Sequence, residues 1–236
     1  MKTTHRMLRK GFTLVELLVV IAIIVALAAL STPTILKSLK EAHMVEATSN
    51  SKQIYNLLIA FNQDWGTFPD DETADKVQAY ASTNAPSPLK GSSSNAHLRQ
   101  LIAGRYVESE TIFYTHGPIT KKPDNNMTGA EGLAAGEVGF GYIMVNDRAQ
   151  NTSGNAGRPV LVTPLKEGAT GAEFDQETFN GKAVILRLDG SVSSERLTTA
   201  GKVLVGGTAD LLGTGPDSVW GDATTPKINP PLANTN

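Results

Sequence analysis

The chain has 236 residues, a formal net charge of −2 at pH 7 and no cysteine. This length suits one domain with an added element, and it is sufficient to bury a substantial core. Disulfide bonds, thiol catalysis and cysteine-ligated zinc are excluded because cysteine is absent. The nearly balanced charge gives no indication of a nucleic-acid-binding surface.

The first part of the chain combines a basic leader with an apolar run. Residues 1–11 hold four basic side chains and no acid, and apolar residues then run without a break from Leu17 to Leu30. As a helix, residues 12–32 would be about 31 Å long, which matches a hydrocarbon core of about 30 Å. We therefore predict a transmembrane segment over 12–32, with the leader in the cytoplasm and the rest of the chain across the membrane.

Three interpretations of this segment are open from composition alone. It could be an uncleaved signal anchor, a secretory signal removed after the small-x-small sequence Ala26-Leu27-Ala28, or a segment whose short leader is removed after Gly11. Glu16, the only charge in residues 12–32, favours the third interpretation. A carboxylate within an apolar span costs about 2.5–3.5 kcal/mol and usually marks a function, which neither of the other interpretations requires.

The sequence Gly11-Phe12-Thr13-Leu14-Val15-Glu16-Leu17 closely resembles the processing motif of type IV pilins and type II secretion pseudopilins. The resemblance implies that a prepilin peptidase cuts after Gly11 and methylates the new N-terminal residue, Phe12. It also implies self-assembly with like subunits on an inner-membrane assembly platform.

Phe12 and Glu16 are four residues apart, so on a continuous helix they would share a face. We expect Glu16 to pair with the N-terminal amine of a neighbouring subunit, because pairing removes most of the cost of a buried carboxylate. The alternative is that Glu16, near the end of the helix, extends to the lipid headgroups.

The helical pattern continues beyond the membrane to residue 65. Apolar or small residues recur at spacings of four and three, typical of an amphipathic helix: Ala47, Ser51, Ile54, Leu58, Phe61 and Trp65. This continuation argues against cleavage after Ala28, which would leave half a helix without a partner for its apolar face. Pro33 lies inside the run and is expected to kink the helix at a flexible point used in assembly; the alternative is a membrane-exit boundary.

Gly66 and Pro69 end this helix, so we expect three parts: a leader (1–11), a long helix (12–65) and a C-terminal domain (66–236). In the domain we predict a loop over 70–95, a helix over 94–103, a strand over 112–114 and a loop over 117–136. Strands are expected at 138–145 and 159–163, and a hairpin at 182–188 and 191–197 turns at Asp189-Gly190. The tail, 206–236, should drape over the domain or fray. The fold class is α+β, with the long helix packed on a small, mainly antiparallel sheet.

We identify no catalytic constellation, and the four histidines have no convincing metal-ligand spacing. Acidic residues gather in one short stretch: Asp70, Asp71, Glu72 and Asp75. A solvated loop is the favoured interpretation and a structural calcium ion the alternative, so no metal or cofactor is expected.

We therefore expect a structural subunit, not an enzyme, of a type II secretion pseudopilus. The alternatives are a major or minor type IV pilin and a membrane-tethered or secreted binding domain. The expected location is the bacterial inner membrane, with a single crossing and a periplasmic domain, and then the periplasmic filament.

Overall fold

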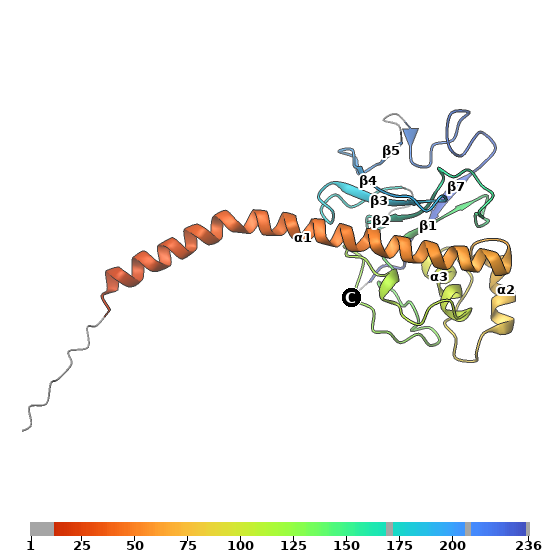
Figure 1. Cartoon of the computed structure of the whole chain (residues 1–236), viewed down its shortest axis with the longest axis horizontal. Coiled ribbons are helices and arrows are strands. Elements are labelled where there is room, and N and C mark those ends of the chain that lie inside the picture. Colours follow the sequence, from red (N-terminus) through yellow and green to blue (C-terminus); the bar gives the residue numbers. More distant parts are fainter. Residues whose placement is uncertain (1–11, 169–171, 206–208, 235–236) are drawn as a thin grey trace, which may run out of the picture. The chain divides into compact units, whose positions relative to one another are not determined.

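The structure, a computed structural model, describes residues 12–168, 172–205 and 209–234 (Figure 1). The leader and the expected cleavage residue, Gly11, lie outside the described residues. The chain forms two compact units, Met1–Leu39 and Lys40–Asn236. Their division falls inside helix α1 (Leu14–Trp65), which has 52 residues, so the larger unit includes the second part of this helix.

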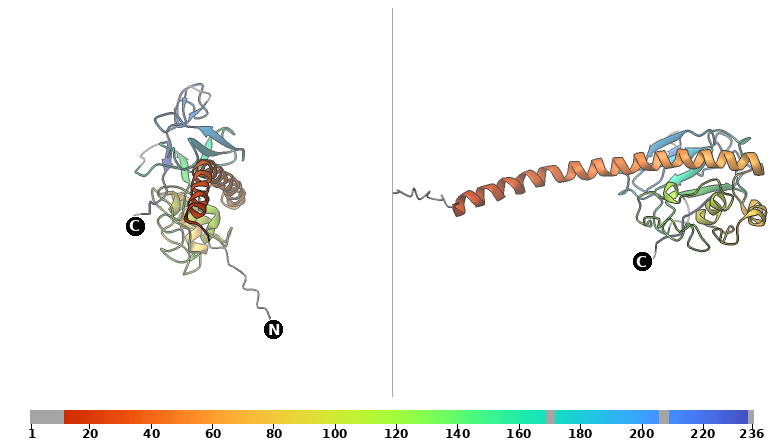
Figure 2. Two further views of the ribbon diagram at one scale, coloured as in Figure 1. Left: turned by 90° about the vertical axis from the view of Figure 1, so that its left-hand side faces the viewer. Right: turned by 60° about the horizontal axis from the view of Figure 1, so that its bottom comes forward.

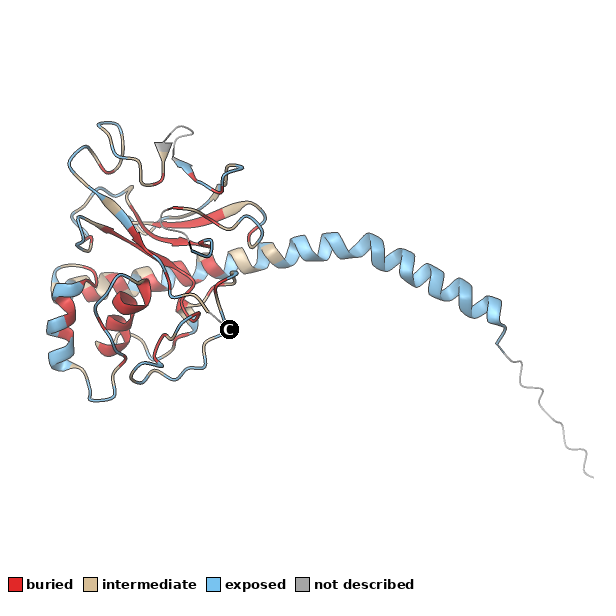
Figure 3. Ribbon diagram, turned by 180° about the vertical axis from the view of Figure 1, so that it is seen from behind, coloured by how far each residue is buried: buried red, intermediate tan, exposed pale blue. Residues whose placement is uncertain are grey.

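In the first unit, α1 is an apolar helix with no covering. Every residue from Phe12 to Leu39 is exposed, as the pale blue helix in Figure 3 shows. The most apolar 18-residue window of α1 has a mean hydropathy of 2.9 and is 0% buried, so this helix is long and apolar enough for one membrane crossing. Pro33 lies inside the helix and does not end it.

The second part of α1 contributes to the core of the larger unit. Its buried residues lie on one face, at helical spacing: Ala47, Asn50, Ser51, Ile54, Leu58 and Phe61. They confirm the predicted stripe, except that Trp65 is only half-buried. The Tyr55 hydroxyl donates a hydrogen bond of 2.9 Å to the Leu188 carbonyl, which joins the helix to the end of a strand. Figure 2 shows this part of the helix running alongside the unit.

A five-stranded sheet forms the centre of the larger unit, with the order β4-β3-β2-β1-β7 and antiparallel pairing throughout. The strands are β1 (Gly141–Val145), β2 (Pro159–Thr163), β3 (Lys182–Arg187), β4 (Val192–Arg196) and β7 (Pro226–Asn229), and a separate pair joins β5 (Leu204–Val205) to β6 (Ala209–Asp210). The hairpin and the strand predicted at 159–163 are confirmed, and the strand predicted at 138–145 is present from Gly141 onward. Gly190 adopts the positive φ of 80° expected in the hairpin turn. The fold class is α+β, as predicted.

Alternate side chains cover the two faces of this sheet. Tyr142, Met144 and Leu186 belong to the same apolar cluster as Ile54 and Leu58 of α1. The side chains that point to the opposite face belong to a second apolar cluster, among them Ile143, Val162 and Ile185. Residues of the C-terminal part of the chain cover this face: Val203, Leu211 and Trp220. Both faces are therefore buried, which agrees with the alternation of side chains along a strand.

The prediction of a loop over 70–95 is wrong for its first part, because Asp71–Tyr80 form helix α2. The Asp70 carboxylate accepts hydrogen bonds from the backbone N–H groups of Glu72 (3.0 Å) and Thr73 (2.9 Å), and the Thr73 hydroxyl accepts from the Asp70 N–H (2.8 Å). This reciprocal capping box starts the helix. Asp71 and Glu72 occupy its first turn, where negative charge is favourable.

Two further predictions differ from the structure. Residues Thr111–Phe113 form a 3-10 turn, η1, in place of the predicted strand, because so short an apolar run does not distinguish a strand from a turn. The tail predicted to drape or fray contains strand β7, which pairs with β1. The predicted helix over 94–103 is confirmed as α3 (Ser94–Ala103).

Candidate functional site

The start of α1 carries a capping box built from Thr13 and Glu16. Glu16 accepts hydrogen bonds from the Thr13 N–H (2.9 Å) and the Thr13 hydroxyl (2.8 Å), and the Thr13 hydroxyl accepts from the Glu16 N–H (3.2 Å). A threonine followed three residues later by glutamate satisfies two of the free N–H groups at a helix start. Glu16 therefore has a partner within its own chain, which the sequence analysis did not identify.

Phe12 precedes the helix, which begins at Leu14, and its side chain is 79% exposed. The shared helix face expected for Phe12 and Glu16 would require the helix, which begins at Leu14, to extend by two residues toward the N-terminus. Around Pro33, the hydroxyls of Ser31 and Thr32 donate hydrogen bonds of 2.8 Å to the carbonyls of Leu27 and Ala28. Ser31 and Thr32 thus have hydrogen-bond partners within the helix.

In the larger unit, buried polar side chains of helix α3 donate hydrogen bonds to a neighbouring loop. Arg99 donates hydrogen bonds to the carbonyls of Gly132 (2.6 Å) and Leu133 (3.0 Å), and Asn95 donates to the Leu133 carbonyl (2.8 Å). Burial lowers the pKa of the Arg99 guanidinium. These bonds fix the loop around residues 132–134 on the helix, and this loop in turn holds a group of acidic side chains.

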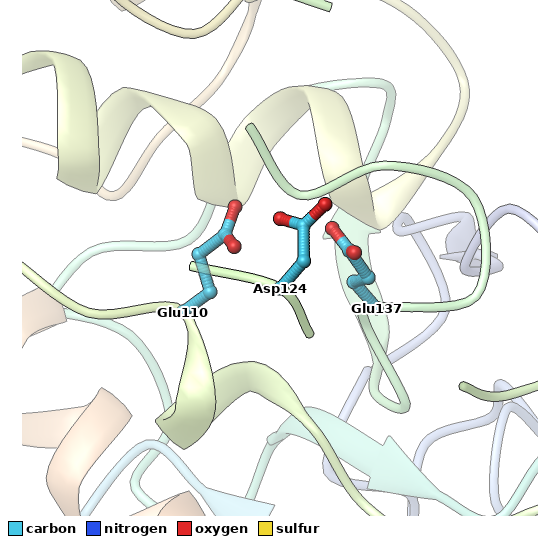
Figure 4. A group of neighbouring side chains, drawn as sticks. All are labelled: Glu110, Asp124 and Glu137. Atoms are coloured by element: carbon cyan, nitrogen blue, oxygen red, sulfur yellow. The ribbon is translucent and has the colours of Figure 1, made fainter. Parts of the chain in front are cut away.

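Glu110, Asp124 and Glu137 form what we name the carboxylate cluster. One carboxylate oxygen from each lies within 4.8 Å of the others, and Figure 4 shows the Asp124 carboxylate between those of the two glutamates. Glu110 and Glu137 are fully buried. Burial raises the pKa of the Glu110 carboxyl; the hydrogen bond from the Leu133 N–H lowers it in part, and the charges of Glu137 and Asp124 raise it further.

The carboxylate cluster was not identified from the sequence. Its three members are distributed over 28 positions, with no regular spacing, in a stretch for which we predicted a strand over 112–114 and a loop over 117–136. No local pattern indicates that such residues meet, since only the path of the loop brings them together.

The acidic group at 70–75 has other partners in the structure. Asp70 caps α2, Asp71 accepts a hydrogen bond from the Gly91 N–H (3.2 Å), and Asp75 pairs with Lys90 at 2.6 Å. Glu72 pairs with Arg148. These carboxylates therefore serve as caps and ion-pair partners and do not converge on one point.

Two of the four histidines stack on each other in the larger unit. The rings of His43 and His116 are parallel within 5°, with 3.4 Å between their centroids, and a Glu46 carboxylate oxygen lies 3.6 Å from His116 Nδ1. Burial lowers the pKa of His116, and the nearby His43 lowers it further. His97 is buried in α3, and burial lowers its pKa as well.

Comparison with known proteins locates one recognisable segment. The family profile described as "Prokaryotic N-terminal methylation motif" matches residues 6–32, well under half of the chain. This is the prepilin-type signature of type IV pilins and pseudopilins, and it implies processing by prepilin peptidase and pilus-like assembly in general. Searches of curated proteins and of solved structures found no match.

Proposed function

We propose that this chain is a structural, non-enzymatic subunit of a type II secretion pseudopilus. One observation carries the proposal: the prepilin-type signature at residues 6–32 is continuous with an apolar helix whose surface is bare. In this proposal the precursor is cut after Gly11 and methylated at Phe12. It is then held in the inner membrane by residues 12–32 until it enters a helical filament.

The exposed apolar surface of the helix supplies the driving force both for insertion in the membrane and for packing in a filament. Apolar surface is stabilised by lipid tails in the membrane and by like helices in a filament, at about 25 cal/mol for each Å² removed from water. The helix can therefore move from one environment to the other without exposing its apolar face to water for long. This property suits a subunit that is extracted from a membrane and assembled.

The orientation follows from the charges at the N-terminus. Basic residues next to a membrane span favour the cytoplasmic side, and the leader contains Lys2, Arg6, Arg9 and Lys10. The larger unit would then lie in the periplasm, first as part of a membrane-anchored subunit and later along the filament.

A type IV pilus subunit, major or minor, is the alternative. Many such pilins close a C-terminal loop with a disulfide bond, and this chain has no cysteine, which favours the pseudopilus. Co-purification of the cross-linked protein with secretion-platform components supports the proposal, and co-purification with pilus components in its place would favour the alternative.

N-terminal sequencing of the mature protein tests the processing step. A first residue of N-methylated Phe12 is the expected result. A first residue of Ala29 would mean a secreted domain, and retention of Met1 would mean a plain membrane anchor; either result would overturn the proposal.

The proposed role of the Glu16 charge in filament assembly can be tested separately from the function of Glu16 as a helix cap. Glu16→Gln removes the charge but keeps an acceptor that a capping box tolerates, whereas Glu16→Ala removes both. We expect both variants to lose filament assembly, because the missing charge can no longer pair with the amine of a neighbouring subunit. Glu41→Ala, at an exposed position of the same helix, is the matched control. Normal filaments from the Glu16→Gln variant would show that filament assembly requires the helix cap and not the charge of Glu16.

A further inference from the structure

The two buried glutamates of the carboxylate cluster are each fixed by one oxygen. Glu110 Oε1 accepts a hydrogen bond of 2.6 Å from the Leu133 N–H, and Glu137 Oε2 accepts one of 2.8 Å from the Ala134 N–H. Consecutive N–H groups of one loop thus orient both carboxylates. Since Arg99 and Asn95 hold this loop on α3, the two side chains are placed by a rigid surrounding structure.

The other oxygen of each glutamate is buried without a hydrogen-bond donor. Among the described residues, Glu110 Oε2 and Glu137 Oε1 have no partner at hydrogen-bonding distance, although both side chains are fully buried; the Asn125 N–H is near enough to the Glu110 carboxyl to lower its pKa in part. A buried carboxylate oxygen without a partner is costly, and each such atom in a folded protein calls for an explanation. Here two of them belong to the same small cluster, together with the carboxylate of Asp124.

Nearby cations compensate this charge only in part. Lys121 Nζ lies 3.7 Å from Glu137 Oε1, beyond hydrogen-bonding distance, and its side chain is 43% exposed. The Arg99 guanidinium directs its N–H groups to the carbonyls of Pro88, Gly132 and Leu133. In the part of the chain that the structure describes, the three carboxylates thus face one partly exposed ammonium and one guanidinium with three of its N–H groups bonded to carbonyls, which leaves room for a further positive charge.

We propose that Glu110, Asp124 and Glu137 bind a hard divalent cation, Ca²⁺ in preference to Mg²⁺. The donors are all carboxylate oxygens, the ligand type that both ions prefer, and one oxygen from each residue lies within 4.8 Å of the others. Ca²⁺ accepts irregular sets of oxygen ligands, whereas Mg²⁺ demands a nearly ideal octahedron. Three carboxylates from an irregular part of the chain therefore suit Ca²⁺ better, and the exposed Asp124 leaves one side open to water ligands.

The cation would join three segments of the larger unit that are far apart in the sequence. Glu110 precedes η1, Asp124 lies in the long loop that follows it, and Glu137 precedes β1. The same stretch contacts α1, because the Asn50 side-chain amide donates a hydrogen bond of 3.0 Å to the Tyr114 carbonyl. A bound ion would therefore brace the loop that lies beside the second part of the long helix.

Calcium titration of the full chain in detergent micelles, after treatment with a chelator, tests the proposal. We expect one Ca²⁺ per chain by calorimetry, weaker binding of Mg²⁺, and a higher melting temperature with Ca²⁺ than with chelator. Glu137→Gln and Asp124→Asn should each weaken Ca²⁺ binding at least about tenfold, the lower end of the range for losing even an outer partner of a metal site.

Glu131→Gln is the matched control, because it removes the same charge from an exposed position of the same loop and should bind Ca²⁺ as the wild type does. Asp124 is exposed, so its variant should fold even if a change at a buried glutamate prevents folding. Absence of binding at Ca²⁺ concentrations up to about 10 mM, above the weakest known sites, would overturn the proposal. Binding that Asp124→Asn and Glu137→Gln leave unchanged would overturn it equally.

Discussion

Replacing Leu58 with alanine tests whether the second part of α1 is a structural member of the larger unit. Leu58 is 0% exposed and packs in the same cluster as Phe61, Tyr142 and Leu186. The substitution keeps the helix intact, since alanine is the best helix former. Any loss of stability therefore reports the packing of this helix face against the sheet and not the helix itself.

The expected loss can be estimated from the buried side chain. Leu→Ala removes three carbon atoms from a fully buried position, which costs about 2.4 kcal/mol at about 0.8 kcal/mol for each carbon group. If about 60 Å³ of cavity remains, at about 24 cal/mol per Å³, this adds about 1.4 kcal/mol. We therefore expect a loss of about 4 kcal/mol, within the roughly 2–5 kcal/mol range for such substitutions.

Urea unfolding of the full chain in detergent, followed by tryptophan fluorescence, measures this loss, because the two tryptophans, Trp65 and Trp220, both lie in the larger unit. The control is Val45→Ala on the same helix, at a position that is 65% exposed, where we expect a change within about 0.5 kcal/mol. A loss below about 1 kcal/mol for Leu58→Ala, with an unchanged urea dependence, would refute the packing of α1 described above.

Three further predictions concern the larger unit. A Cβ at Gly139 would lie 2.9 Å from the Thr115 backbone nitrogen, so Gly139→Ala should lower the free energy of unfolding by about 1–3 kcal/mol; unchanged urea unfolding would contradict this close approach. Trp220 is buried, and its Nε1 donates a hydrogen bond of 2.8 Å to the Leu211 carbonyl. Trp220→Ala should therefore cost about 3–5 kcal/mol and make residues after 210 sensitive to limited proteolysis; a resistant tail would argue against its anchoring role. The pKa values of His97 and His116 lie below their usual 6.5, so the unfolded chain binds protons there at higher pH than the folded chain does. Their contribution to stability is present above about pH 6.5 and is lost as the pH falls through the lowered folded pKa values. The urea midpoint should fall between about pH 7.5 and 5.5, and less so when both histidines are replaced by glutamine; an equal fall in that double variant would contradict the assignment.

Periodic features of the fold could be predicted from the sequence. The helix from Leu14 to Trp65, its buried stripe, α3 and the hairpin at Asp189-Gly190 all follow from spacing and turn residues. Each of these features depends on neighbours within a few positions, and such local patterns indicate structure reliably.

Features that depend on distant partners could not be predicted. Strand β7 lies in a stretch rich in proline and asparagine, and it is a strand because β1 offers it a free edge. Helix α2 is different, because its capping residues Asp70 and Thr73 are local; it was missed because its acidic first turn resembles a solvated loop until the Asp70 cap is considered. The carboxylate cluster depends on the path of an irregular loop, and no residue pattern encodes that path.

The position of β7 at the edge of the sheet has a consequence for the order of folding during synthesis. β1 needs β7 to pair its free side, with Ile143 opposite Ile228 and Val145 opposite Pro226. Residues 226–229 leave the ribosome after β1, β2, β3 and β4, and long after α1. The sheet can therefore be completed only once the chain has been made beyond Asn229. A premature stop just before Pro226 would leave the long helix intact and the edge of β1 open, which is a typical starting point for aggregation.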